Sequence, residues 1–180
     1  ALSFQTHILS APNLNTACGH PVTPSVPAAA TVRSHVLLLF SCPPSPHGLA
    51  SLFQAGGFAV DDYDVCNGDQ YDLADDSVWR PLRERLLAGY YAACFASPPC
   101  STFSRLRSLP GGPGPLRGIT GRDRYGLKHL NIKNAELVRL HNLLATRAAE
   151  ALSISLRMHS AAIVEQPALR EQEVSMFRLD

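Results

Sequence analysis

The chain has 180 residues, of which 46% are hydrophobic and 17% charged, and its formal net charge at pH 7 is +1. This length supports one domain with a substantial core rather than two, and the near-neutral charge excludes a polybasic tail protein but not a local basic surface. No apolar run approaches the roughly 20 residues of a membrane-spanning helix, so we expect a soluble protein with no membrane partner. The five cysteines show no C-x-x-C spacing, and with no secretory signal visible they indicate reduced thiols in an intracellular compartment.

Residues 1–34 are rich in Pro, Ser, Thr and Ala and show neither helical nor strand periodicity. We predict that they form a flexible lead-in to a domain that spans residues 35–180. From His35 onward, short apolar runs alternate with amphipathic segments. The runs predict strands at 35–40, 58–64, 90–97 and 161–167, and the amphipathic segments predict helices at 47–57, in the later part of 75–89 and at 134–156. This alternation predicts an α/β, Rossmann-like fold with a mostly parallel sheet flanked by helices.

Polar residues follow each predicted strand, where ligands bind in sheets of this kind. They are Ser41 and Cys42, then Asp62 and Asp64, then Cys100, and finally Glu165. "SPPC" (97–100) is the most unusual of these strand ends, because two prolines would hold the Cys100 thiol at a fixed, exposed place. We interpret Cys100 as a thiolate nucleophile whose pKa is lowered by the nearby Arg105 and Arg107. The alternative is a small apolar filler.

These strand ends carry a family resemblance. "FASPPCSTFS" (95–104) resembles the catalytic Pro-Cys loop of the cytosine-C5 DNA methyltransferases, and "IVEQP" (163–167) resembles their Glu-Asn-Val motif. "LLLFS" (37–41) is similar to the strand that enters their methyl-donor site. "DDYD" (61–64) is similar to the acidic strand end that holds the ribose of S-adenosylmethionine, and "YDL" (71–73) to the aspartate that reads its adenine. All five motifs occur in the family's order.

The resemblance implies transfer of a methyl group from S-adenosylmethionine to C5 of cytosine in DNA, with RNA as an alternative substrate. Cys100 would attack C6 of a base flipped out of the duplex, and Glu165 would hold N3. The implied S-adenosylmethionine-binding residues are Phe40, Ser41, Asp62, Tyr63, Asp72, Ser97 and Pro98. The implied nucleic-acid-binding residues are Ser101, Ser104, Arg105, Arg107 and Arg117. The implied compartment is the nucleus or nucleoid.

The segment after Cys100 suits a phosphate-binding role. Residues 101–126 carry five arginines against one acidic residue, Asp123, which gives a formal charge of +4. Glycines at four positions between 111 and 118 favour mobility. We therefore expect a lid that closes on phosphates, and the alternative is a solvated surface loop.

The chain also departs from the family. "FSCPPSPHG" (40–48) keeps one glycine, Gly48, where the donor loop is glycine-rich. Only 15 residues follow Glu165, so we expect an incomplete catalytic core, with a partner chain as a candidate source of target recognition. No metal is expected, because Cys66 and Leu73 stand where an EF-hand beginning at Asp62 needs oxygen ligands.

Three other functions remain open. The first is a non-catalytic Rossmann-like module that binds nucleic acid or a protein and lacks the target-recognition region. The second is an amino-methyltransferase, although Cys100 stands where such enzymes have a stacking aromatic residue. The third is a cysteine hydrolase with His129, His141 or His159 as the base of Cys100.

Overall fold

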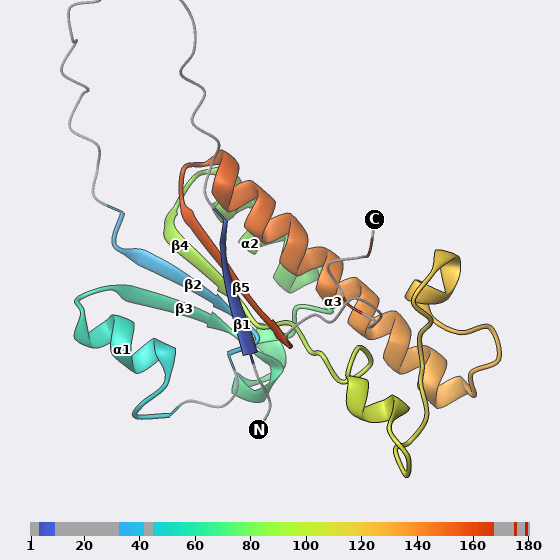
Figure 1. The fold of residues 1–180 in the computed structure, drawn as a ribbon. Coiled ribbons are helices and arrows are strands. Elements are labelled where there is room, and N and C mark those ends of the chain that lie inside the picture. Colours follow the sequence, from blue (N-terminus) through green and yellow to red (C-terminus); the bar gives the residue numbers. More distant parts are fainter. Residues whose placement is uncertain (1–3, 10–32, 42–44, 168–174, 176–178, 180) are drawn as a thin grey trace, which may run out of the picture.

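The computed structural model describes residues 4–9, 33–41, 45–167, 175 and 179. Its strands form one sheet in the order β1-β5-β4-β2-β3 (Figure 1). The strands are β1 Phe4–Leu9, β2 His35–Leu39, β3 Ala59–Tyr63, β4 Tyr91–Ala96 and β5 Ala161–Pro167. β2 is parallel to β3 and to β4, and β4 is parallel to β5. The predicted α/β, Rossmann-like fold with a mostly parallel sheet is confirmed.

The prediction of a flexible lead-in is wrong at its beginning. β1 pairs antiparallel with β5, from Phe4 opposite Pro167 to Leu9 opposite Ala162. β5 without β1 would be an edge strand with unpaired backbone N–H and C=O groups. β1 forms by pairing with these groups, although its sequence has no strand periodicity. Arg33 is also part of the fold, because its guanidinium donates to the Met158 carbonyl and the Ser160 hydroxyl. Residues 10–32 lie outside the described part of the chain.

Three helices connect the parallel strands: α1 Leu49–Ala55, α2 Asp76–Leu87 and α3 Ile132–Arg157. Short 3-10 helices occur at Val65–Asn67, Asp69–Tyr71, Arg105–Ser108 and Gly121–Tyr125. Because parallel crossovers are right-handed, α1 covers one face of the sheet, while α2 and α3 cover the other and contact each other. α2 begins after its cap Asp75, whose carboxylate accepts from the Ser77 amide, so the helix starts earlier than the later part of 75–89 that was predicted. Pro81 lies in its second turn.

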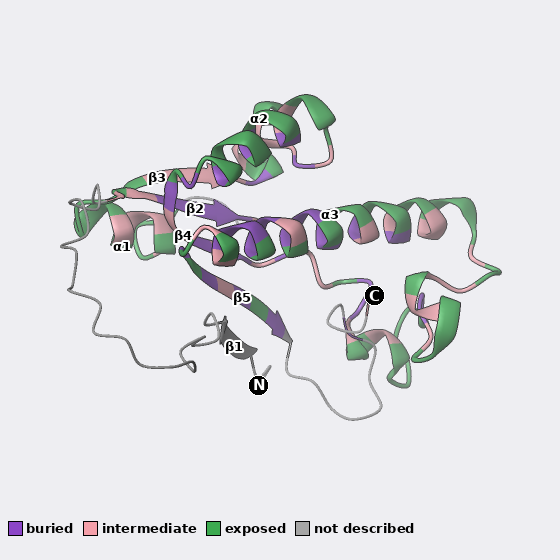
Figure 2. Ribbon diagram, turned by 90° about the horizontal axis from the view of Figure 1, so that it is seen from above, coloured by how far each residue is buried: buried purple, intermediate pink, exposed green. Residues whose placement is uncertain are grey.

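The core lies between the sheet and the α2–α3 layer. β2 is buried on both of its faces, with Val36, Leu37, Leu38 and Leu39 at most 1% exposed. The side of α3 that meets the sheet carries small residues as far as Ser155, and these let the helix pack closely against β4 and β5. Figure 2 shows this buried side of α3, and it shows the first turns of the helix projecting past the sheet. In the described part of the chain, no helix is both long enough and apolar enough to cross a bilayer.

The strand order places a ligand site. From β2 the chain moves outward to β3 and then returns across β2 to β4. The connections leaving β2 and β4 therefore diverge at their carboxyl ends, and a crevice between such connections is the usual ligand site in open α/β sheets.

Candidate functional site

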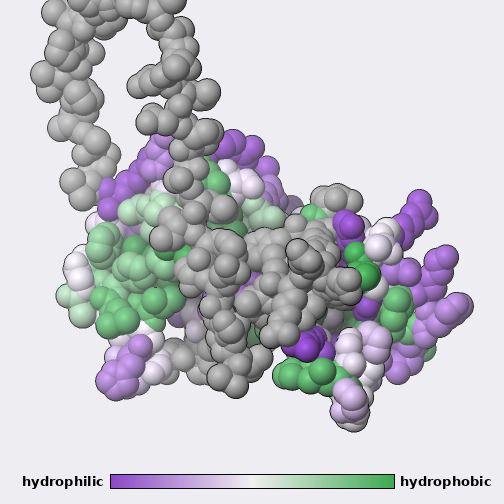
Figure 3. Space-filling model, in the orientation of Figure 1, coloured by the Kyte–Doolittle hydropathy of each residue, from purple (hydrophilic) through white to green (hydrophobic). Residues whose placement is uncertain are grey.

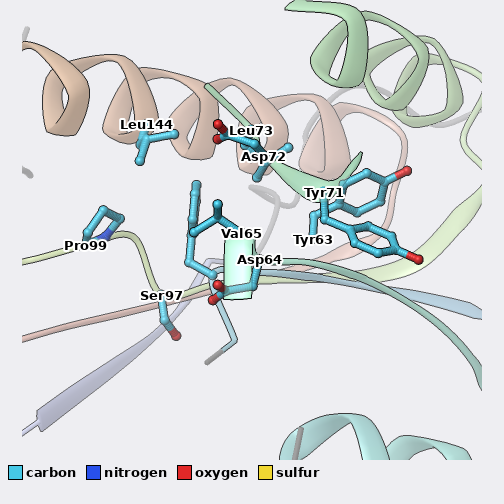
Figure 4. A pocket seen from close by; sticks show the side chains of 10 residues that line it. Tyr63, Asp64, Val65, Tyr71, Asp72, Leu73, Ser97, Pro99 and Leu144 are labelled. Carbon is cyan, nitrogen blue, oxygen red and sulfur yellow. The ribbon is translucent and has the colours of Figure 1, made fainter. Parts of the chain in front are cut away.

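A pocket of about 210 Å³ opens at this switch point (Figure 4). Its wall comes from the ends of β2, β3 and β4, from the 3-10 segment after β3, and from α3. The lining residues are Phe40, Tyr63, Asp64, Val65, Tyr71, Asp72, Leu73, Ser97, Pro99 and Leu144. Four of the predicted cofactor residues are among them, namely Phe40, Tyr63, Asp72 and Ser97.

The predicted ribose-binding carboxylate is on the wrong face of its strand. Asp61 and Tyr63 face the α2–α3 layer, where the Tyr91 hydroxyl donates to Asp61 Oδ2 at 2.7 Å. Side chains alternate along a strand, so Asp62 points to the opposite face. There it accepts from the Ser41 hydroxyl at 2.5 Å, and burial raises the pKa of its carboxyl. Ser41 and Asp62 thus bond to each other rather than line the pocket.

Asp64 and Asp72 are the carboxylates of the pocket. Asp64 is 9% exposed, and its Oδ1 accepts from the Cys66 amide at 2.8 Å. Asp72 Oδ1 accepts from the Ala74 amide at 2.8 Å. Each carboxylate is therefore held in place by a turn of its own backbone. Strand alternation would place Asp64 on the same face as Asp62, but β3 ends at Tyr63 and Asp64 caps the 3-10 helix that follows, so the strand pattern does not identify Asp64.

Aromatic side chains form one wall. The rings of Tyr63 and Tyr71 meet edge to face with centroids 5.8 Å apart, and Figure 4 shows them together on one side of the pocket. Phe40 lies at the end of β2 with φ of 61°, a region that bulky residues rarely adopt and that marks stored strain. Its amide donates to the Tyr63 carbonyl at 2.9 Å. The wall can hold a flat ring while the two carboxylates accept hydrogen bonds from hydroxyl or ammonium groups.

Cys100 and Glu165 lie at neighbouring strand ends that are tied together. The Ser97 hydroxyl donates to Glu165 Oε2 at 3.0 Å, and the Gln166 side-chain amide donates to the Pro98 carbonyl at 3.2 Å. Pro98 is buried in this connection, and its neighbour Pro99 lines the pocket in its place. Pro98, the predicted cofactor-binding proline, therefore does not line the pocket.

The environment of Cys100 does not activate the thiol as predicted. The residue is half-buried, and burial is the main cause that raises the pKa of its thiol. The negative charge of Glu165 raises that pKa further, while the Cys100 amide opposes the shift. Neither Arg105 nor Arg107 is a cause of this shift, so the predicted lowering of the Cys100 pKa is wrong.

Arg117 has no access to a nucleic acid, contrary to prediction. It is 2% exposed, and its three guanidinium nitrogens donate to Thr102 Oγ1, to Asn142 Oδ1 and to the carbonyls of Arg124 and Val138. Its guanidinium stacks on Phe103 at 3.8 Å. Burial lowers its pKa to about 10, which leaves it charged at neutral pH.

The other predicted nucleic-acid residues divide into two pairs. The Ser104 hydroxyl accepts from the Leu106 amide, and Arg107 Nε donates to the Gly114 carbonyl at 2.9 Å, so both side chains hold the loop itself. Ser101 and Arg105 are exposed beside Cys100. The loop after Cys100 is therefore bonded within itself and, through Arg117, to α3.

Among the described histidines, including the three candidate bases of a hydrolase, none is hydrogen-bonded to Cys100. His141 Nδ1 instead lies 3.1 Å from Thr102 Oγ1. Nor does the described part of the chain contain a group of three His, Cys, Asp or Glu side chains placed to hold a metal ion.

A comparison of the chain with known protein families, curated proteins and solved structures found no match.

Proposed function

We propose that the chain is a cytosine-C5 methyltransferase-like catalytic core that uses S-adenosylmethionine to methylate DNA. One observation carries the proposal. The thiol of Cys100 and the carboxylate of Glu165 lie at adjacent strand ends joined through Ser97 and Gln166, beside a pocket that contains two carboxylates and an aromatic wall. A thiol nucleophile and a carboxylate for the ring nitrogen are the two groups that this reaction requires.

The residues divide the chemistry as follows. The Cys100 sulfur, once deprotonated, attacks C6 of the base, and the C5–C6 π electrons move to C5 while Glu165 holds the ring at N3. S-adenosylmethionine supplies the electrophilic methyl group. After C5 has gained the methyl group, its proton is lost to solvent. The electron pair of that C–H bond restores the C5–C6 double bond as the C6–S bond breaks, and Cys100 leaves as a thiolate.

The pocket suits the donor. Asp64 and Asp72 would accept hydrogen bonds from hydroxyl and ammonium groups, and Tyr63 and Tyr71 would pack on its flat ring. A cationic donor is also attracted by the two carboxylates. The substrate is DNA, with RNA as the alternative, and Ser101 and Arg105 would approach it beside Cys100. A nuclear or nucleoid location, with a partner chain that supplies target recognition, belongs to the same proposal.

Covalent trapping tests this function. The 180-residue chain is mixed with S-adenosylmethionine and duplex DNA that contains 5-fluorocytosine, and denaturing electrophoresis then detects the adduct. We expect an adduct that Cys100→Ser abolishes. Cys66→Ser, which changes an exposed cysteine in another loop, should leave it intact. An adduct that survives Cys100→Ser would contradict the assignment of the nucleophile.

A second candidate function is a non-catalytic module that binds nucleic acid or a protein. The raised pKa of Cys100 favours it, because a thiol without an activating cation is a poor nucleophile at neutral pH. Calorimetry with S-adenosylmethionine separates the two candidates. Measurable donor binding supports the methyltransferase, and absent binding together with an absent adduct supports the module.

A further inference from the structure

We propose that residues 101–143, called the overhang below, form a surface that binds the sugar-phosphate backbone of a nucleic acid. Its phosphate contacts are Arg122, which belongs to the lid expected from the sequence, and Lys128, Lys133 and Arg139, which lie outside that lid. The inference deepens the proposed function, on which it rests for the choice of nucleic acid as the partner.

The overhang lies at the same edge of the sheet as Cys100. α3 leaves the carboxyl end of β4 and returns to the amino end of β5, so its first turns are at the carboxyl edge. The helix reaches the pocket at Leu144, and residues 132–143 extend past it by about 18 Å at 1.5 Å per residue. Figure 1 shows these turns beside the two loops that precede them. This length is comparable to about five phosphates of one DNA strand, at about 3.4 Å each.

The overhang is a fixed frame and not a free loop. Arg117 joins three parts of it: Thr102 after Cys100 at 3.0 and 3.1 Å, Asn142 of α3 at 2.6 Å, and the Arg124 carbonyl at 2.9 Å. The Asn142 side-chain amide also donates to the Tyr125 carbonyl at 2.8 Å. Cations carried on such a frame lose less freedom on binding than cations on a mobile segment.

Charge is strongly separated between the overhang and the rest of the chain. Eight Arg and Lys against two acidic residues give the overhang a formal charge of +6. The rest of the chain has eight Arg and Lys against thirteen acidic residues, a charge of −5. The overall charge of +1 therefore conceals a basic region beside Cys100. Figure 3 shows strongly hydrophilic side chains gathered at the right edge, over the loops and the N-terminal half of α3.

Among the described residues, four arginines outside the overhang pair with carboxylates, the first being Arg80 with Asp76 at 3.9 Å. Arg83 pairs with Glu150 at 2.6 Å, Arg85 pairs with Asp61 at 3.3 Å, and Arg147 pairs with Asp76.

The four proposed contacts differ from these in pairing. Arg122, Lys128, Lys133 and Arg139 are exposed, and none forms an ion pair with any described residue. Glu136, between Lys133 and Arg139 on α3, is bonded to neither. Four exposed cations without carboxylates, next to a site for a base, fit a polyanion whose charges are regularly spaced.

Fluorescence anisotropy with a labelled DNA duplex tests the surface. The protein carries Cys100→Ser and no methyl donor is added, so binding is measured without chemistry. The overhang variant combines Lys128→Ala, Lys133→Ala and Arg139→Ala. The matched control combines Arg80→Ala, Arg83→Ala and Arg157→Ala, which removes the same charge from exposed positions outside the overhang.

We expect the overhang variant to bind DNA at least about tenfold more weakly. The slope of log K against log salt should also fall by about 2.7, since each lost phosphate contact accounts for about 0.9. The control should change that slope by less than about one. Equal losses in the two variants, or no binding by the unmodified surface, would overturn the inference. Binding of polyglutamate as tight as that of the duplex would replace nucleic acid by an acidic polypeptide. If the affinities are as expected but no 5-fluorocytosine adduct forms, the proposed methyltransferase activity is wrong and the nucleic-acid-binding surface stands.

Discussion

Acid should destabilise this protein through His141. The imidazole is 6% exposed, and its Nδ1 lies 3.1 Å from the Thr102 hydroxyl. Burial and the charge of Arg117 lower its pKa to about 4 from an ordinary 6.5. Because the pKa is lower in the folded than in the unfolded state, His141 contributes stability above pH 6.5 that is lost as the pH falls through about 4. The difference corresponds to an upper limit of about 3 kcal/mol, a large part of the roughly 5–15 kcal/mol that stabilises a domain.

Urea unfolding at several pH values measures this contribution. His141→Gln keeps a polar side chain that can bond to Thr102 but cannot titrate, so its stability should fall less on acidification than that of the unmodified protein. Carboxylates lose their contributions equally in both proteins, so the difference between the two curves isolates the histidine. Between about pH 7 and pH 4 that difference should grow by about 2–3 kcal/mol. Curves that remain parallel would show that His141 is protonated without unfolding, and the assignment of a buried neutral imidazole would be wrong.

Three further predictions follow from the site. Arg117→Met removes the guanidinium that donates to Thr102 Oγ1 and Asn142 Oδ1 and should lower the unfolding free energy by about 2–4 kcal/mol. Arg122→Met at an exposed position should change it by less than about 0.5 kcal/mol in the same urea experiment. Because the pKa of Cys100 is raised, the rate of its alkylation by iodoacetamide should rise about tenfold per pH unit, with no plateau below about pH 9. Peptide mass spectrometry measures this rate, and a plateau near neutral pH would indicate an activated thiolate. In calorimetry with S-adenosylmethionine, Asp64→Asn should weaken binding at least about tenfold and Asp62→Asn about threefold or less, and the reverse order would return the ribose contact to Asp62.

The sequence contained most of the fold because each parallel strand is nearly a continuous apolar run. Such runs are required of strands buried on both faces, as β2 is. β1 could not be predicted in this way, because its strand exists by pairing with the open edge of β5. The pocket lies at the ends of these strands, and its wall includes four of the residues expected to bind a cofactor, Phe40, Tyr63, Asp72 and Ser97.

The errors concern where side chains point. Asp62 and Asp64 have the same chemistry and would share a face in a continued strand, but β3 ends between them, and only Asp64, at the turn that follows, lines the pocket. Arg117 is an arginine in a basic loop, and composition alone cannot show that its guanidinium is enclosed by Thr102, Asn142 and Phe103. Direction and burial are set by contacts between segments distant in sequence, so a local pattern does not contain them.

The burial of Arg117 changes how the loop after Cys100 can work. A mobile lid would lose conformational entropy each time it closed on a substrate. The lid expected from the sequence would use its arginines to bind phosphates when it closes. In the structure Arg117 instead holds the loop against α3. Arg107 and Arg124 donate to carbonyls within the loop region. The loop therefore loses its conformational entropy when the protein folds and not when a ligand binds. The four exposed cations proposed as phosphate contacts remain available to a polyanion. They lie next to a pocket that contains two carboxylates, and the proposed donor is cationic. A single domain with almost no net charge can in this way present opposite charges to two ligands of opposite sign at one edge of its sheet.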